Sequence, residues 1–141
     1  MEDLESLAVR GTKVILLEMP FGVWSEELYR VVRKVRERGL IPVLAHVDRY
    51  PAERVKPFLE EEYFVQLNAE GFASFFRRRA FLPHIESGLV VGLGSDLHGC
   101  ADNAYRPFNR LRKYLGPRAD RIFSHTAELL KDAVALNPKK D

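Results

Sequence analysis

The sequence lacks the marks of a membrane, secreted or disulfide-bonded protein. Its single cysteine, Cys100, has no partner for an internal disulfide, which is typical of a protein kept in a reducing compartment. The longest apolar runs, 14–17 and 40–45, are far too short to cross a bilayer. The chain begins Met-Glu-Asp-Leu-Glu, which is acidic where a secretory signal is basic. We therefore expect a cytoplasmic location and no membrane insertion.

An excess of charge of one sign is also missing. The 22 Lys and Arg residues against 20 Asp and Glu residues leave a formal net charge of +2, which is too small to indicate a nucleic-acid partner. Two basic clusters, 30–38 and 77–79, are expected to face water, as most runs of charge do. With 46% hydrophobic and 30% charged residues, the composition is that of a globular protein.

The chain has no low-complexity tract and no Gly/Ser linker, so residues 1–141 are expected to form a single domain. A chain of 141 residues is long enough to bury a core. It is too short for a complete eight-stranded β/α barrel, which takes about 250 residues.

Apolar, β-branched runs alternate with helical patterns along the chain. This alternation predicts an α/β fold in which helices cover both faces of a parallel sheet. Ser25 is the expected N-cap of the first helix and Gly39 its C-terminal stop. The expected strands are 14–17, 41–45, 64–68 and 89–94, with a very short fifth at 122–124, and the later helices are 51–60, 70–87, 103–115 and 126–136. Gly71 and Pro83 are expected to bend or divide the third of these helices.

Polar side chains follow the expected strands, at the edge where α/β proteins gather their chemistry. Glu18 follows the first strand, His46 follows the second and Asn68 ends the third, while Asp96 and His98 follow the fourth and point to one side of it. A single residue of this kind is more often an ordinary polar end of a strand. The combination of carboxylates and imidazoles at one edge favours a site for Zn²⁺, Mn²⁺ or Fe.

Two arginines follow these candidate ligands closely. Arg49 comes three residues after His46, and Arg106 comes eight residues after His98. Guanidinium groups beside a metal site are suited to phosphate, because they bind its oxygens bidentately. The competing interpretation places them in surface ion pairs, such as Arg49 with Glu53.

Other residues near these segments have more than one interpretation. Cys100 and Arg106 match the Cys-x₅-Arg pattern of cysteine-dependent phosphatases, but the loop between them lacks glycine and contains Asp102, so this mechanism is disfavoured. Phe21 and Trp24 are candidates to line the mouth of the site, with core packing the expected role of Phe21. Structural roles are expected for His84 and His125.

Four segments resemble one protein family in order and spacing: 17–21 (Leu-Glu-Met-Pro-Phe), 41–50 (Ile-Pro-Val-Leu-Ala-His-Val-Asp-Arg-Tyr), 66–69 (Gln-Leu-Asn-Ala) and 94–98 (Gly-Ser-Asp-Leu-His). They are similar to the bacterial manganese-dependent protein-tyrosine phosphatases of the PHP (polymerase and histidinol phosphatase) superfamily. The resemblance covers the chain from about residue 13 onward. It implies a distorted (β/α)₇ barrel, and a tyrosine autokinase of capsular or exopolysaccharide synthesis as substrate.

Carried over by position, the resemblance implies that Glu18, His46, Asp96 and His98 are metal ligands. It implies that Arg49 and Arg106 bind the phosphate. The metals, expected to be manganese with iron or zinc as alternatives, would activate a hydroxide for direct attack on phosphorus.

The sequence departs from the family where the His-x-His motif of the first strand and the ligands before Glu18 should stand, because none of these is found. The chain is therefore expected to match only the second half of the barrel, without its N-terminal strands. Either a partner or a second copy would supply the remainder, or the chain is a fragment of a longer protein. Two other functions remain open, a degenerate binding or regulatory module without catalysis and a phosphoesterase for a small phosphate ester.

Overall fold

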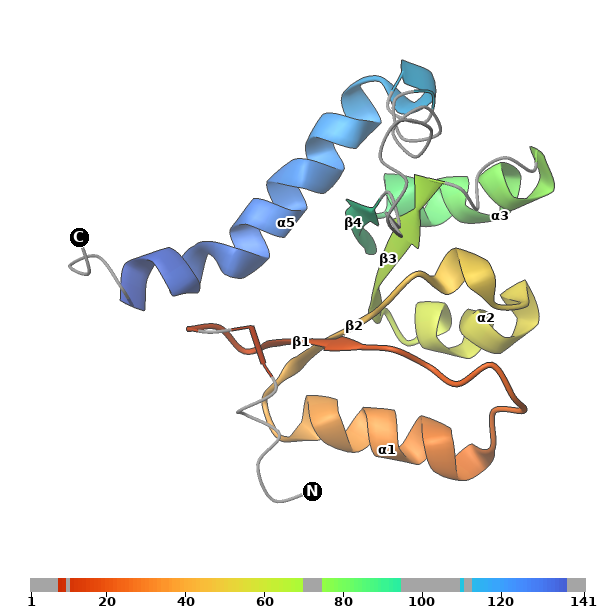
Figure 1. The fold of residues 1–141 in the computed structure, drawn as a ribbon, viewed down its shortest axis with the longest axis vertical. Coiled ribbons are helices and arrows are strands. Elements are labelled where there is room, and N and C mark those ends of the chain that lie inside the picture. Colours follow the sequence, from red (N-terminus) through yellow and green to blue (C-terminus); the bar gives the residue numbers. More distant parts are fainter. Residues whose placement is uncertain (1–7, 10, 70–74, 95–109, 111–112, 137–141) are drawn as a thin grey trace, which may run out of the picture.

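The computed structural model describes residues 8–9, 11–69, 75–94, 110 and 113–136. The described residues contain a four-stranded, all-parallel sheet whose strand order follows the sequence, β1-β2-β3-β4 (Figure 1). The strands are β1 (Val14–Leu17), β2 (Ile41–Leu44), β3 (Phe64–Asn68) and β4 (Val90–Gly94). The predicted alternation of parallel strands and helices is confirmed.

Helices connect the strands in the way that parallel pairing requires. The connecting helices are α1 (Glu26–Glu37), α2 (Ala52–Glu60) and α3 (Phe75–Glu86), with a short 3₁₀ turn, η2 (Val47–Arg49), between β2 and α2. Helix α5 (Pro117–Leu136) comes after β4. Helix α1 has the predicted ends. The Ser25 hydroxyl accepts a hydrogen bond from the backbone N–H of Leu28 at 3.3 Å, and Gly39, with a φ of 84°, follows the helix.

The main core lies where α1, α2 and α3 pack on one face of the sheet (Figure 1). Its centre is aromatic. The ring of Phe58 lies 4.7 Å from that of Tyr29, 5.3 Å from that of Tyr63 and 6.0 Å from that of Trp24, measured between centroids. These tilted and offset arrangements are the favourable ones for aromatic pairs.

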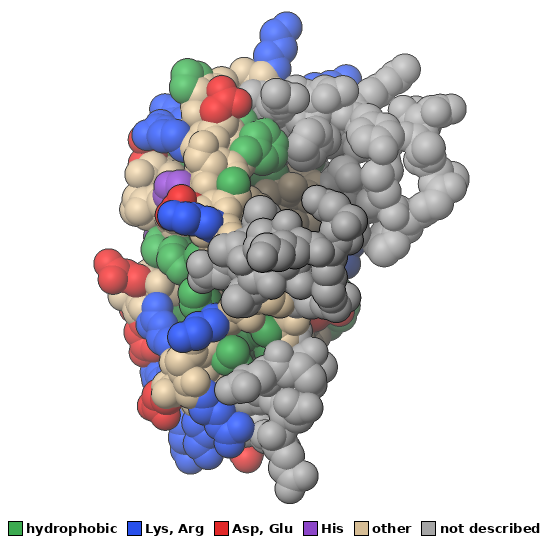
Figure 2. Space-filling model, turned by 90° about the vertical axis from the view of Figure 1, so that its left-hand side faces the viewer, with side chains coloured by type: hydrophobic (Ala, Val, Ile, Leu, Met, Phe, Trp, Pro, Cys, Tyr) green, Lys and Arg blue, Asp and Glu red, His purple; other side chains and the backbone are tan. Residues whose placement is uncertain are grey.

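Basic residues of α1 join this helix to the end of α2. Arg36 donates to the carbonyls of Glu61 and Glu62 at 2.8 Å each, and its guanidinium lies 3.9 Å from the ring centroid of Tyr63. Arg33 forms a two-pronged ion pair with the Glu61 carboxylate, which lowers the pKa of Glu61. The basic cluster is therefore exposed, as predicted, and also structural. On the face drawn in Figure 2, Lys and Arg side chains are interspersed with Asp and Glu.

The second face of the sheet is covered by the C-terminal part of α5. Val14, Val43 and Val91 pack there against Leu129 and Leu130. The cover is partial, since Leu16 on the same face of β1 remains 58% exposed.

Residues 122–124 do not form the expected fifth strand. They lie inside α5, which begins at Pro117 rather than at 126. Pro117 suits the first turn of a helix, and the buried residues Ala119 and Ile122 recur at helical spacing on the core side.

Pro83 lies within α3 and does not divide it. Most of the expected helix 103–115, and Gly71, lie outside the described residues. Among the helices that the structure describes, none is long and apolar enough to cross a membrane.

Candidate metal site at the carboxyl edge of the sheet

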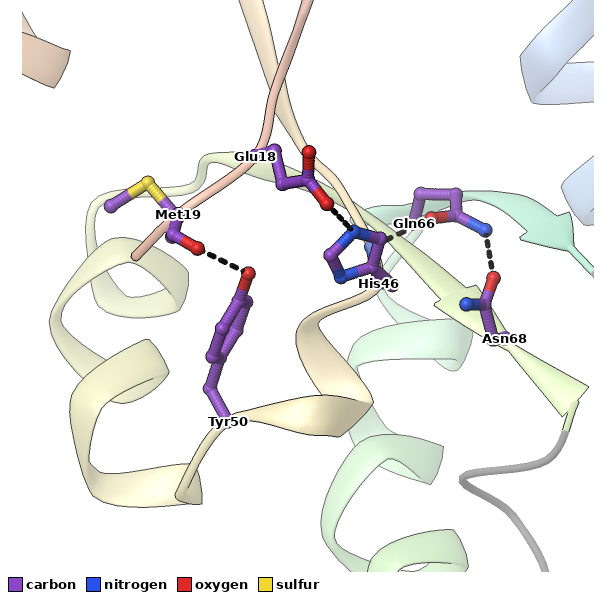
Figure 3. Close-up of polar contacts among 6 residues, drawn as sticks. All are labelled: Glu18, Met19, His46, Tyr50, Gln66 and Asn68. Atoms are coloured by element: carbon purple, nitrogen blue, oxygen red, sulfur yellow. Dashed lines mark hydrogen bonds and ion pairs between the residues drawn. The ribbon is translucent and has the colours of Figure 1, made fainter. Parts of the chain in front are cut away.

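Glu18 and His46 meet at the carboxyl ends of β1 and β2 (Figure 3). The register pairs Leu17 with Leu44, and the N–H of Ala45 donates to the carbonyl of Leu17 at 2.8 Å, so the two strands end side by side. Glu18 Oε1 lies 2.9 Å from His46 Nε2. The His46 side chain is only 13% exposed and that of Glu18 is 72% exposed. The pair therefore presents a carboxylate to solvent beside a sheltered imidazole.

The backbone of His46 adopts the left-handed conformation, with φ of 34° and ψ of 53°. This region costs a residue with a side chain on the order of 1–3 kcal/mol and persists only where neighbouring groups enforce it. Here the His46 N–H donates to Gln66 Oε1 at 2.6 Å, and the His46 carbonyl accepts from the N–H of Arg49 at 3.1 Å. The conformation turns the chain from β2 directly into η2.

Side-chain amides and a buried carboxylate form a layer beneath this pair. Gln66 Nε2 donates to Asn68 Oδ1 at 2.8 Å (Figure 3), and the N–H of Asn68 donates to Asp48 Oδ1 at 2.7 Å. Asp48 is 3% exposed and Asn68 is also buried. Asn68, a polar residue expected at the end of its strand, is thus part of this hydrogen-bonded network. Gln66 and Asp48 were not predicted to take part, although a polar Gln inside the apolar strand 64–68 was a signal for the former.

The donor chemistry of the pair fits a divalent metal. A carboxylate oxygen and an imidazole nitrogen suit Mn²⁺, Fe or Zn²⁺, and ligand atoms that each lie about 2.0–2.2 Å from one ion are about 3 Å apart. His46 Nδ1 is buried and has no hydrogen-bond partner among the described residues. The part of the chain that the structure describes contains no group of three or more His, Cys, Asp or Glu residues that could hold a metal. Glu18 and His46 therefore bring together two donor groups suited to a metal, and a complete metal site would need others.

The structure places one of the two predicted phosphate-binding arginines. Arg49 ends η2, is half-buried and follows His46 by one turn. Asp96, His98 and Arg106 lie outside the described residues, as does Cys100 of the alternative cysteine motif. Of the predicted site residues, the structure thus describes Glu18, His46 and Arg49, and it brings the first two into contact.

Of the two aromatic residues after Glu18, the one expected in the core is exposed and the other is buried. Phe21, expected in the core, is 70% exposed, whereas Trp24 is buried. Trp24 is held inside because its Nε1 donates to the carbonyl of Pro20 at 2.7 Å and its ring lies 5.1 Å from that of Tyr50. The Tyr50 hydroxyl donates to the carbonyl of Met19 at 2.6 Å (Figure 3), and burial raises the pKa of Tyr50.

The other two histidines lie away from Glu18. His84 is near the end of α3, where burial lowers its pKa. His125 is on α5, and its Nδ1 lies 3.1 Å from the carbonyl of Gly88, just before β4. Both positions are close to the opposite, amino edge of the sheet.

Comparison with known proteins finds a similar curated protein and a similar solved structure. No family model matches the chain. The chain is 27% identical over 135 residues to the tyrosine-protein phosphatase YwqE of Bacillus subtilis (strain 168), a match that covers 88% of this chain and 53% of the relative. The chain thus spans about half the length of that protein.

A solved structure from work on YwqE of Bacillus subtilis and CpsB of Streptococcus pneumoniae, described as metal-dependent tyrosine phosphatases, matches with a TM-score of 0.68. The sequences are 24% identical, and the match covers 93% of this chain and 59% of the other. The α/β fold is therefore that of part of a PHP-type barrel. The resemblance that the motifs predicted, to the bacterial metal-dependent tyrosine phosphatases, is confirmed by the sequence and by the fold.

Proposed function

We propose that this chain supplies Glu18 and His46 to the metal centre of a phosphatase that hydrolyses phosphotyrosine on proteins. The observation that carries the proposal is the 2.9 Å approach of Glu18 Oε1 to His46 Nε2 at the carboxyl edge of the sheet. The similarity to a tyrosine-protein phosphatase supports the reaction. The shared fold supports the location of the site, because parallel β/α folds place their chemistry at this edge.

Asp96 and His98 are the further ligands in this proposal, with manganese as the expected metal and iron or zinc as alternatives. When bound, divalent ions lower the pKa of coordinated water and offset the charge of the phosphate. Glu18 supplies negative charge from solvent-exposed oxygens, and His46 supplies a nitrogen whose ring is fixed by its sheltered position.

Arg49 and Arg106 bind the phosphate. Arg49 is carried on η2, and its backbone N–H is bonded to the carbonyl of His46, so the turn that shapes His46 also fixes the backbone from which the Arg49 side chain extends. The two guanidinium groups neutralise the charge of the phosphate oxygens. They also favour the transition state, in which the charge of those oxygens is redistributed. Phe21, exposed three residues after Glu18, offers an aromatic face for the tyrosine ring of the substrate.

The expected partner is a tyrosine autokinase of capsular or exopolysaccharide synthesis, encountered in the cytoplasm. This assignment is supported by the motifs in segments 17–21, 41–50 and 94–98. The remaining ligands of the metal centre would come from a partner, from a second copy, or from a preceding segment of a longer protein.

Hydrolysis of a phosphotyrosine peptide, with and without added Mn²⁺, tests the proposal. We expect Mn²⁺-dependent turnover that is lost in His46→Ala and His98→Ala and retained in His84→Gln, a histidine variant outside the site. Turnover that survives chelation but is lost when iodoacetamide alkylates Cys100 would instead establish the cysteine mechanism. Faster turnover of a small phosphate ester than of the peptide would reassign the substrate.

A second candidate function is metal-dependent binding of a phosphoprotein without turnover. The observation that favours it is the pair of donor groups, Glu18 and His46, which can hold a metal beside a phosphate without activating water. Binding of the peptide with Mn²⁺ and no hydrolysis by the folded chain would support this candidate over catalysis.

A further inference from the structure

The hydrogen bonds around Gln66 allow only one orientation of its side-chain amide. Its Oε1 accepts from the N–H of His46, while its Nε2 donates to the carbonyl of Leu67 at 3.0 Å and to Asn68 Oδ1 at 2.8 Å. The reversed amide would set its NH₂ group against an N–H donor and its oxygen against two acceptors. The oxygen is therefore directed at His46.

His46 needs this acceptor because the ladder between β2 and β3 ends before it. The register pairs Val43 with Phe64 and Leu44 with Val65. Beyond Leu44 the chain turns into η2, and the His46 N–H meets a side-chain oxygen in place of a strand carbonyl. The Gln66 side chain thus extends the ladder by one bond at the residue where the backbone becomes left-handed.

Glycines on β4 leave the space in which these amides lie. The register pairs Gln66 with Gly92 and Asn68 with Gly94. A Cβ on Gly94 would lie 2.6 Å from both Asn68 Oδ1 and Gln66 Nε2, too close for either amide to stay in place. A Cβ on Gly92 would lie 3.1 Å from Gln66 Cγ. The glycines of β4 therefore allow the Gln66 amide to reach the His46 N–H.

We infer that Gln66 is a positioning residue of the metal site: its amide holds His46 in the left-handed conformation that directs the imidazole to Glu18, in space that Gly94 leaves open. The inference rests on the proposed metal site and adds two residues that touch neither metal nor phosphate. The geometry gives each a defined part. Gln66 provides the acceptor for the His46 N–H. Gly94, which has no side chain, leaves the space that the Gln66 amide occupies.

Two variants and a matched control test this inference. Gln66→Ala removes the acceptor, and Gly94→Ala displaces it without altering Gln66. Gly22→Ala is the control, because a Cβ there has nothing within 4 Å. We expect the dissociation constant for Mn²⁺, measured by titration calorimetry, to rise roughly ten- to a hundred-fold in both test variants and to stay unchanged in the control.

A measurement on the metal-free chain separates this inference from the proposed function. We expect hydrogen exchange at the His46 amide to accelerate in Gln66→Ala and Gly94→Ala, and the ¹⁵N resonances of its ring to shift, while Gly22→Ala matches the parent chain. Unchanged exchange and unchanged Mn²⁺ affinity in both test variants would overturn the inference. If the parent chain bound no Mn²⁺, the proposed function would fail, and the exchange rate at His46 would still decide the role of Gln66.

Discussion

The aromatic core beneath α1 and α2 and the carboxyl edge of the sheet differ in how their groups are paired. In the core, Trp24, Tyr29 and Phe58 are in mutual contact, and the polar ends of the first two have partners: Trp24 Nε1 bonds the carbonyl of Pro20, and the Tyr29 hydroxyl bonds that of Arg54 at 2.9 Å. At the edge, His46 has a φ of 34° and a buried Nδ1 without a partner among the described residues.

The difference separates a part of the molecule that stabilises the fold from a part whose local geometry costs stability. Packed rings provide free energy of folding, whereas a strained backbone and an unpaired buried nitrogen consume it. Tyr50 connects the two regions, since its ring lies 5.1 Å from that of Trp24 and 5.9 Å from that of His46. Tyr50 therefore links the strained edge to the core through ring packing.

The largest expected loss of stability comes from a substitution in the aromatic core. Phe58→Ala removes a fully buried ring that contacts three others, and we expect the free energy of unfolding to fall by about 3–5 kcal/mol, measured by urea denaturation. Phe21→Ala is the matched control, because this exposed ring should change stability by no more than about 0.5 kcal/mol. Equal losses in the two variants would show that the core does not carry the stability.

The next largest effect is the stabilisation by Mn²⁺ expected at the carboxyl edge of the sheet. Under the proposed function, Mn²⁺ at about a hundred times its dissociation constant should stabilise the chain by about 2.7 kcal/mol, because it binds the folded state alone. Thermal denaturation with Mn²⁺ and again after chelation measures this gain. We expect no gain in His46→Ala and a full gain in His84→Gln. A gain that persists in His46→Ala would place the metal elsewhere.

A smaller effect is expected where the two regions join. Tyr50→Phe removes the donor to the Met19 carbonyl and leaves that buried group unpaired, which should lower the free energy of unfolding by about 1–3 kcal/mol. The ring itself stays, so contacts with Trp24 are kept. Chemical denaturation measures the loss, and a value near zero would mean that water replaces the hydroxyl.

The smallest effect is confined to alkaline pH. Burial raises the pKa of Tyr29, Tyr50 and Tyr63 above their usual value of 10.0. The unfolded chain therefore loses these protons first, so their contribution to stability is complete below pH 10.0 and declines as the pH rises further, by at most about 1.4 kcal/mol per pH unit for each tyrosine. Denaturation midpoints across this range measure the slope, which should be shallower in Tyr50→Phe. A steeper slope in that variant would contradict the sign.

Much of the fold followed from local signals in the sequence. Ser25 and Gly39 set the ends of α1 through capping and a positive φ, which are properties of single residues. The strand at 14–17 followed from its apolar run, which begins with the β-branched residues Val14 and Ile15. The expectation at 122–124 was wrong because a short apolar pair such as Ile122 and Phe123 fits either a strand or a helix, and only packing against the core selected the helix.

The candidate site was predictable in part for the same reason. Glu18 and His46 could be paired from their positions after successive strands, since parallel strands end at one edge. Gln66 was marked only as a polar residue in an apolar strand, and the roles of Gln66 and Gly94 could not be derived, because they depend on a cross-strand register that no local pattern encodes. The burial of Trp24 and exposure of Phe21, three residues apart, were likewise set by the neighbouring ring of Tyr50 and the carbonyl of Pro20.

By itself, the sequence determined the alternation of strands and helices, the edge at which polar residues gather and the family that the motifs resemble. These rest on hydrophobic periodicity, capping and residue order, which are local properties. Only the tertiary structure decided that His46 becomes left-handed, that its N–H bonds a side chain of β3, and that a glycine of β4 leaves room for that side chain. Each of these requires atoms from strands far apart in the sequence to meet within hydrogen-bonding or van der Waals distance.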